Sequence, residues 1–128
     1  MSLTNAFETS TLQYLLTTGS VTRPTAWYVG LFTSDPTDTG TAGTEVSGSG
    51  YARTAATFSV TGDTASNTAS IEFPAASGGN WGTIGWIGIM DASSGGNMII
   101  HSALDTAKAI NDGDVFRIPT GDLDITAS

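Results

Sequence analysis

The sequence contains no cysteine, few basic residues and no long apolar run. Without cysteine the chain has no disulfide framework, no thiolate zinc site and no redox dithiol. Four Lys and Arg residues face twelve Asp and Glu residues, and the formal net charge is -8. This balance excludes a nucleic-acid binder that works by neutralising phosphates. The longest apolar stretch, residues 84–90, includes two glycines and is too short for a transmembrane helix.

What the chain does contain is enough apolar material for one core. Hydrophobic residues make up 39% of the sequence and include three tryptophans, whereas only 12% of the residues are charged. The length of 128 residues suits a single domain spanning 1–128. The N-terminus has neither a basic segment nor a long apolar one, so we expect no signal peptide.

Apolar spacing predicts one helix followed only by strands. The helix is expected at about residues 5–18, with Asn5 and Glu8 spaced as in a capping box. Two of the strands are apolar on both alternations and should be covered on both faces. The expected strands fall between 26 and 126, at 26–33, 51–60, 67–73, 84–91, 98–104, 115–118 and 122–126.

This pattern predicts an all-β fold, namely a two-sheet antiparallel sandwich, jelly-roll-like, with one N-terminal α-helix. A closed barrel is the alternative. The turn at 93–97 predicts a hairpin between the strands on either side. The missing βαβ rhythm argues against a Rossmann or TIM architecture.

No set of residues predicts catalysis, a cofactor or a metal. His101 is the only histidine, and its neighbour Ser102 points to the opposite face of the expected strand, so the two do not form a nucleophile–base pair. The acids at 35 and 38, 112 and 114, and 122 and 124 lie at turns or on outer strand positions and do not match a calcium loop. We therefore expect no enzyme and no cofactor, with surface calcium and glycan binding left open.

Two longer stretches together carry a resemblance. The first is E-V-S-G-S-G-Y-A-R at 45–53, preceded by A-W-Y-V-G-L-F-T-S-D-P at 26–36. The second runs from W-G-T-I at 81–84 to D-A-S-S-G-G-N at 91–97. With these stretches the chain resembles a family of small tailed-bacteriophage virion proteins, often labelled phage tail fibre protein, some of which are similar to jelly-roll capsid cement proteins.

The resemblance implies a structural protein of the virion. We expect a capsid cement (head decoration) protein that bridges and stabilises subunits of the major capsid protein through many weak contacts. The alternative is a tail fibre, baseplate or other tail-associated component. The expected form is a homo-oligomer, a trimer, on the capsid surface, made in the bacterial host cytoplasm, with neither nucleic acid nor membrane as a partner.

The candidate contact residues are Glu45, Tyr51 and Arg53, because Tyr and Arg are enriched at interface hot spots. The alternative interpretation makes Tyr51 an edge residue and Arg53 the partner of a nearby acid. The helix at 5–18 and the loop at 37–50 are the segments expected to reach partners. The tryptophans are expected in the core.

Overall fold

The computed structural model describes residues 2–127. This part of the chain forms one helix and ten short strands, in the order β1 (Ser2–Leu3), α1 (Asn5–Leu16), β2 (Tyr28–Phe32), β3 (Thr54–Ala55), β4 (Phe58–Thr61), β5 (Thr64–Asn67), β6 (Ile71–Glu72), β7 (Gly82–Met90), β8 (Met98–Ile110), β9 (Arg117–Ile118) and β10 (Asp124–Thr126).

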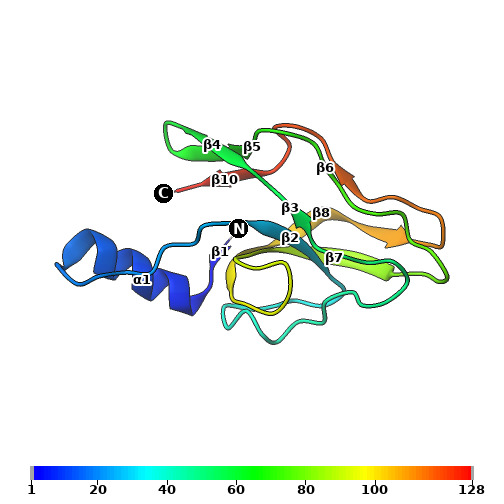
Figure 1. The fold of residues 1–128 in the computed structure, drawn as a ribbon, viewed down its shortest axis with the longest axis horizontal. Helices are drawn as coiled ribbons and strands as arrows, with labels where there is room; N and C mark the ends of the chain where they lie inside the picture. The colour runs from blue at the N-terminus through cyan, green and yellow to red at the C-terminus, as the bar shows by residue number, and fades with distance from the viewer. Residues whose placement is uncertain (1, 128) are drawn as a thin grey trace.

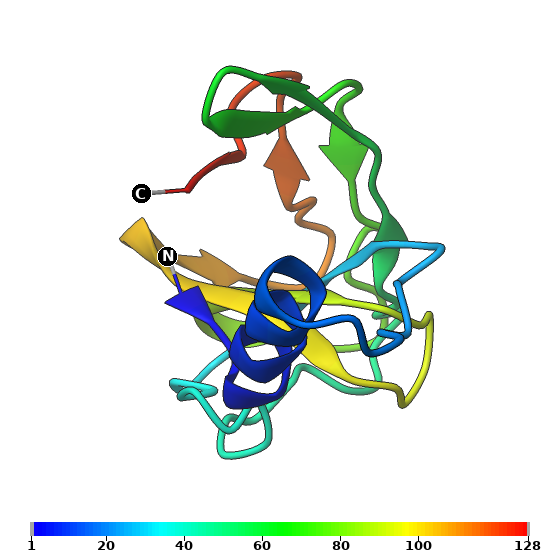
Figure 2. The same ribbon diagram turned by 90° about the vertical axis from the view of Figure 1, so that its left-hand side faces the viewer.

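The strands form antiparallel sheets in a sandwich-like arrangement, as Figures 1 and 2 show. One layer is a five-stranded sheet with the order β1-β8-β7-β2-β3. The facing layer is divided into a three-stranded sheet, β10-β5-β4, and a two-stranded sheet, β6-β9. The predicted all-β sandwich with one N-terminal helix is confirmed for residues 2–127, with the second layer in two pieces.

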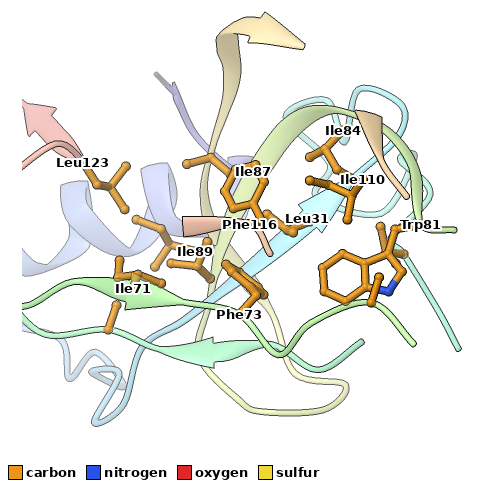
Figure 3. Close-up of a cluster of buried hydrophobic side chains, with 14 of the residues drawn as sticks. Leu31, Ile71, Phe73, Trp81, Ile84, Ile87, Ile89, Ile110, Phe116 and Leu123 are labelled. Atoms are coloured by element: carbon orange, nitrogen blue, oxygen red, sulfur yellow. The ribbon is translucent and has the colours of Figure 1, made fainter. Parts of the chain in front are cut away.

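The main core lies between these layers. Strands β2 and β7 point alternate residues inward, and the side chains of Leu31, Ile87 and Ile89 meet those of Ile71 and Phe73 from the other layer. Figure 3 shows these labelled side chains converging, together with Phe116 and Leu123 from the C-terminal part of the chain. Of the three tryptophans, Trp81 is buried in this core, while Trp27 and Trp86 are half-buried.

The outer face of the five-stranded sheet is also covered. Phe32, Met90 and Met98 form a second buried cluster there, with Tyr28 and Trp86 packed against it. Residues 33–50 close over this face, and Gly40 lies so near Met98 that an added Cβ would be 3.1 Å from its side chain. The prediction that β2 and β7 are covered on both faces is therefore confirmed. Part of the loop that was expected to reach partners packs on its own sheet.

The helix differs from its predicted form at both ends. Its N-cap is Thr4 and not Asn5, so the capping box expected for Asn5 and Glu8 does not form. The Thr4 hydroxyl donates to the carbonyl of Met98 at 2.7 Å and accepts no N–H from the first turn of the helix. The helix ends at Leu16, two residues early, because Thr17 adopts an extended backbone and turns its hydroxyl back to the Gln13 carbonyl.

Several strand boundaries also differ, because the chain changes layers inside segments whose alternation is continuous. The segment predicted at 51–60 is divided into β3, which pairs with β2, and β4, which pairs with β5 in the other layer. The segment at 67–73 is divided between β5 and β6, which belong to the two separate sheets of the facing layer. The strands predicted at 26–33, 115–118 and 122–126 are shorter than expected. No strand was predicted at β1, which pairs with β8.

The predicted hairpin at 93–97 is confirmed, since β7 and β8 pair antiparallel across it. Strand β8 extends six residues past its predicted end at 104. The extension contains a bulge, because Trp86 pairs with Ala103 while Ile84 pairs with Lys108. Gly85 lies opposite this bulge. No helix in the described part of the chain is long and apolar enough to cross a membrane.

Buried Asn67 joins the C-terminal segment to the sandwich. It is 2% exposed, and its amide nitrogen donates to the carbonyls of Ala69 and Pro119 at 2.8 and 3.0 Å. Its amide oxygen accepts the backbone N–H of Leu123 at 2.9 Å. The bonds with Pro119 and Leu123 therefore fix the path of the chain toward β10, and the bond with Ala69 fixes the backbone just after β5.

We predict that Asn67→Ala lowers the free energy of unfolding by about 2–3 kcal/mol, because it leaves a buried N–H and two carbonyls without their partner. Urea denaturation followed by tryptophan fluorescence measures this loss. The matched control is Asn97→Ala, whose amide lies exposed on the 91–97 turn. Equal losses in the two variants would contradict the role of Asn67.

Candidate functional site

The three residues predicted as contact residues come together in the structure. The Tyr51 hydroxyl donates to Glu45 Oε2 at 2.6 Å. The Arg53 guanidinium donates to both oxygens of the same carboxylate, from Nε to Oε2 and from Nη2 to Oε1, each at 2.8 Å. We call Glu45, Tyr51 and Arg53 the carboxylate network. Glu45 thus accepts three short hydrogen bonds, two of them in the bidentate geometry that makes Arg–carboxylate pairs strong.

The carboxylate network completes the hydrogen bonding along one edge of β2. Strand β3 pairs only with Tyr28 and Val29, which leaves the rest of that edge without a neighbouring strand. There the Tyr51 hydroxyl accepts the backbone N–H of Leu31 at 3.0 Å, and the Leu31 carbonyl accepts the N–H of Val46 at 3.0 Å. An edge that would otherwise present free backbone groups is covered by residues 44–51.

Glycine at position 30 makes room for this arrangement. A Cβ on Gly30 would lie 2.9 Å from Glu45 Oε2 and 3.4 Å from the Tyr51 hydroxyl oxygen, so a larger residue would push both groups away. The turn between Glu45 and Tyr51 uses Gly48, Ser49 and Gly50, all with positive φ. These turn residues let the chain reverse so that Tyr51 and Arg53 face the acid that precedes them.

Arg53 also joins the network to the turn between β7 and β8. Its Nη1 donates to the carbonyl of Ala92 at 2.9 Å and to that of Gly95 at 2.8 Å. Asp91 organises the same turn by accepting the N–H of Asn97 at 2.7 Å. The two sequence stretches that carry the family resemblance, 45–53 and 91–97, therefore meet in space through one guanidinium.

The surroundings favour charge on Arg53 and the neutral form of Tyr51. The Arg53 side chain is 9% exposed, and its hydrogen bonds to Glu45 raise its pKa. Burial, and next the bond to Glu45, raise the pKa of Tyr51 well above its usual range. The Tyr51 ring packs edge-on against Trp81, whose indole N–H donates to the Ser49 carbonyl at 2.9 Å.

The structure thus pairs Arg53 with a nearby acid, which was the alternative to a role in contacting another protein. Four of the five N–H donors of Arg53 form hydrogen bonds within the chain. Contact with another protein through the network stays a prediction. The sequence indicated the residue types but not the partners of Arg53, because Ala92 and Gly95 contribute only backbone carbonyls, which no sequence pattern marks.

His101 and Ser102 do not contact each other. The His101 ring is half-buried and its Nε2 lies 2.9 Å from Asp38 Oδ1, while Ser102 donates to the carbonyl of Ala103. Asp38 also accepts the Ser2 hydroxyl at 3.2 Å, and these bonds, that of His101 first, lower its pKa. The cluster connects residues 33–50 and β1 to β8.

Some of the remaining acids bond to their own turn or to a neighbouring strand. Asp35 accepts the N–H of Thr37, Asp114 accepts that of Asn111, and Asp124 accepts the Ser66 hydroxyl of the neighbouring strand. Among residues 2–127, no three His, Asp or Glu side chains are grouped so that they could hold a metal ion.

A different kind of surface lies on α1. None of its residues is buried, and the large apolar side chains Leu12, Tyr14, Leu15 and Leu16 are 58–76% exposed. Figure 1 shows the helix projecting from one end of the sandwich, with the chain between α1 and β2 returning alongside it. Between them lies a groove of about 530 Å³. The sequence pointed to this helix as a segment that reaches partners, but not to the groove, which depends on the path of residues 17–27.

Fold and surface together define a small all-β sandwich protein whose edges and turns are fixed by side chains and whose N-terminal helix projects from it. A family model described as "Podophage GP4 fiber I protein gp80" matches residues 2–126, and the chain belongs to this family. It is thus a structural, fibre-related protein of the virion of a tailed phage. No curated protein matches the chain.

Arg53→Lys keeps the positive charge but loses the bidentate pair and the simultaneous reach to two carbonyls. We predict that it lowers the free energy of unfolding by about 1–2 kcal/mol. The matched control is Arg117→Lys, since exposed Arg117 makes one side-chain hydrogen bond, to Ser70, and should change stability by less than about 0.5 kcal/mol. Chemical denaturation measures both; an unchanged Arg53→Lys protein would contradict the assigned role.

The raised pKa of Tyr51 predicts that the folded chain loses stability at alkaline pH. Because its pKa is raised on folding, the folded chain keeps a proton that the unfolded chain releases above about pH 10. The raised pKa of Tyr51 makes a contribution to the free energy of unfolding that is fully present below about pH 10 and is lost as pH rises toward the raised pKa.

Tyr51→Phe removes this titration, so its free energy of unfolding should fall less steeply than that of the wild type above about pH 10. Urea unfolding at a series of alkaline pH values measures the two slopes. Tyr14→Phe, at an exposed position on α1, controls for the loss of a phenol as such. Identical slopes for Tyr51→Phe and the wild type would show that Tyr51 is not the group responsible.

Proposed function

We propose that the chain is a structural subunit of a tail fibre and works by binding, as a homo-oligomer, not by catalysis. The observation that carries the proposal is the match of the fibre family over residues 2–126, almost the whole length of the chain. The site supports a binding role, because the most connected polar side chains, those of the carboxylate network, fix backbone edges and turns.

The surface also suits a protein that works among neighbours. Only 12% of the residues are charged, and the acids named above bond to their own turns or to neighbouring strands. Loops rich in Thr, Ser and Gly can pack against another protein without removing many ions from water, which is costly. A trimer would repeat each weak contact three times, and repeated contacts bind far more strongly than one.

A head position is the second candidate. It is favoured by the compact shape of the domain, because the described part of the chain contains no extended shaft of the kind that carries a receptor-binding tip away from the particle. A cement protein needs only a compact domain that bridges neighbouring subunits of the major capsid protein. In that case the partner is the capsid surface and the protein is present in many copies.

The location and copy number in purified virions separate the two roles. We predict that gold-labelled antibody against the chain marks the tail, and that quantitative mass spectrometry finds a small number of copies relative to the major capsid protein. Label spread over the head, with copies comparable in number to the capsid subunits, would instead establish the cement role. A virion that lacks the protein would rule out both.

A further inference from the structure

Helix α1 has more apolar surface than its own chain covers, since Phe7 packs against the core but Leu12, Tyr14, Leu15 and Leu16 are exposed. It is 12 residues long, and isolated helices of that length are only marginally stable in water. Its apolar residues are not confined to one stripe, since Leu12 and Leu16 lie on a different side from Phe7 and Tyr14. A helix that is apolar on more than one side is normally surrounded by protein.

One side of α1 forms the wall of the groove. Phe7, Tyr14 and Leu15 contribute apolar surface, and the returning chain adds Val21 and Pro24. The groove also contains Arg23, which is exposed and forms no ion pair among residues 2–127. The groove is therefore an apolar channel with one unpaired positive charge on its wall.

The adjoining face of α1 forms a ridge. Glu8, Leu12 and Leu16 follow one another at intervals of four residues, which places them in one row along the helix. Glu8 is the only charged residue in α1, and it too is exposed and makes no ion pair within the described chain. The ridge thus offers two leucines and one negative charge, which complement the apolar groove and Arg23.

We propose that the ridge of one copy of this chain docks in the groove of a second copy. The inference rests on the homo-oligomer of the proposed function but not on the position of the protein in the virion. The distribution of charge favours a second copy of the chain as the protein that fills the groove. The net charge is -8, so most faces of two copies repel each other, whereas ridge and groove together carry one acid and one base.

A contact between a ridge and a groove is made twice in a two-fold dimer, where each copy offers its ridge to the other's groove, and once per pair in a head-to-tail series. In a head-to-tail series, only the two end copies keep a free ridge or a free groove until the series closes on itself. A contact of this kind produces a ring when the rotation between copies closes and a filament when it does not. The expected trimer is a head-to-tail ring of three copies.

The test uses the full chain and measures its mass in solution by sedimentation over a range of concentrations. We predict that the wild type forms an oligomer and that Leu12→Gln with Leu16→Gln, which keeps good helix formers on the ridge, shifts it to monomer. The matched control is Val60→Gln, because Val60 is 73% exposed on β4, away from α1, and should leave the oligomer unchanged.

Charge reversal tests the pairing of the two surfaces. Glu8→Arg and Arg23→Glu each place like charges opposite each other and should weaken association several-fold, while the double variant restores opposite charges and should restore association. Unchanged tryptophan fluorescence shows that the sandwich is intact in the monomeric variants, as does a urea midpoint equal to that of the wild type at dilutions where the wild type is also monomeric. Helical circular dichroism should fall on dilution of the wild type.

A monomeric wild type at every concentration overturns the proposal, as does an oligomer that survives the double leucine substitution. Failure of the double charge reversal to restore association also contradicts the assigned pairing. These results are independent of the location experiment, because a protein found on the head can still assemble through α1, and a tail protein can prove monomeric in solution.

Discussion

The bidentate pair between Arg53 and Glu45 is the interaction on which the arrangement of this end of the sandwich depends. It holds the turn at 45–53 against the open edge of β2, and the same guanidinium reaches across to the turn between β7 and β8. Three segments distant in sequence are thus fixed by one side chain. Its geometry requires a planar, fully charged group with several donors, which among side chains only arginine provides.

The burial of the central strands explains why the open edge of β2 needs these hydrogen bonds. Because β2 and β7 are buried on both faces, their backbone groups cannot turn to water and must be paired at every position. Strand β3 covers only the first residues of β2, so the rest of that edge depends on Tyr51 and on the backbone of residues 44–46. The carboxylate network substitutes for a missing strand along the part of the β2 edge that β3 leaves open.

The central layer could be predicted from local pattern. The segments at 26–33 and 84–91, which are apolar on both alternations, identified β2 and β7. The turn at 93–97 identified the hairpin that joins β7 to β8. The crossings between layers could not be predicted, since the alternation at 51–60 continues while the chain changes its pairing partner from β2 to β5. Likewise the local pattern indicated a capping box at Asn5 and Glu8, whereas the helix begins after Thr4, whose hydroxyl donates to the carbonyl of Met98 far along the chain.

The carboxylate network and helix α1 also differ in how far the sequence alone could predict them. Glu45, Tyr51 and Arg53 could be selected by residue type, but their hydrogen bonds to the Leu31 amide and the Ala92 carbonyl depend on long-range folding. Helix α1 differs, because its spacing is local and the structure leaves its apolar side chains uncovered. The molecule therefore consists of a sandwich that satisfies its own groups and a helix with exposed apolar side chains, on which we propose that a second copy docks.

Amide hydrogen exchange tests this division most directly, when dilute and concentrated samples of the full chain are compared. The account predicts that the Leu31 amide is strongly protected in both samples, because its partner, the Tyr51 hydroxyl, belongs to the same chain. The amides of α1 should exchange rapidly in the dilute sample and become protected on concentration. Equal protection of α1 at both concentrations would contradict the account, since the helix would then be stable without a second copy.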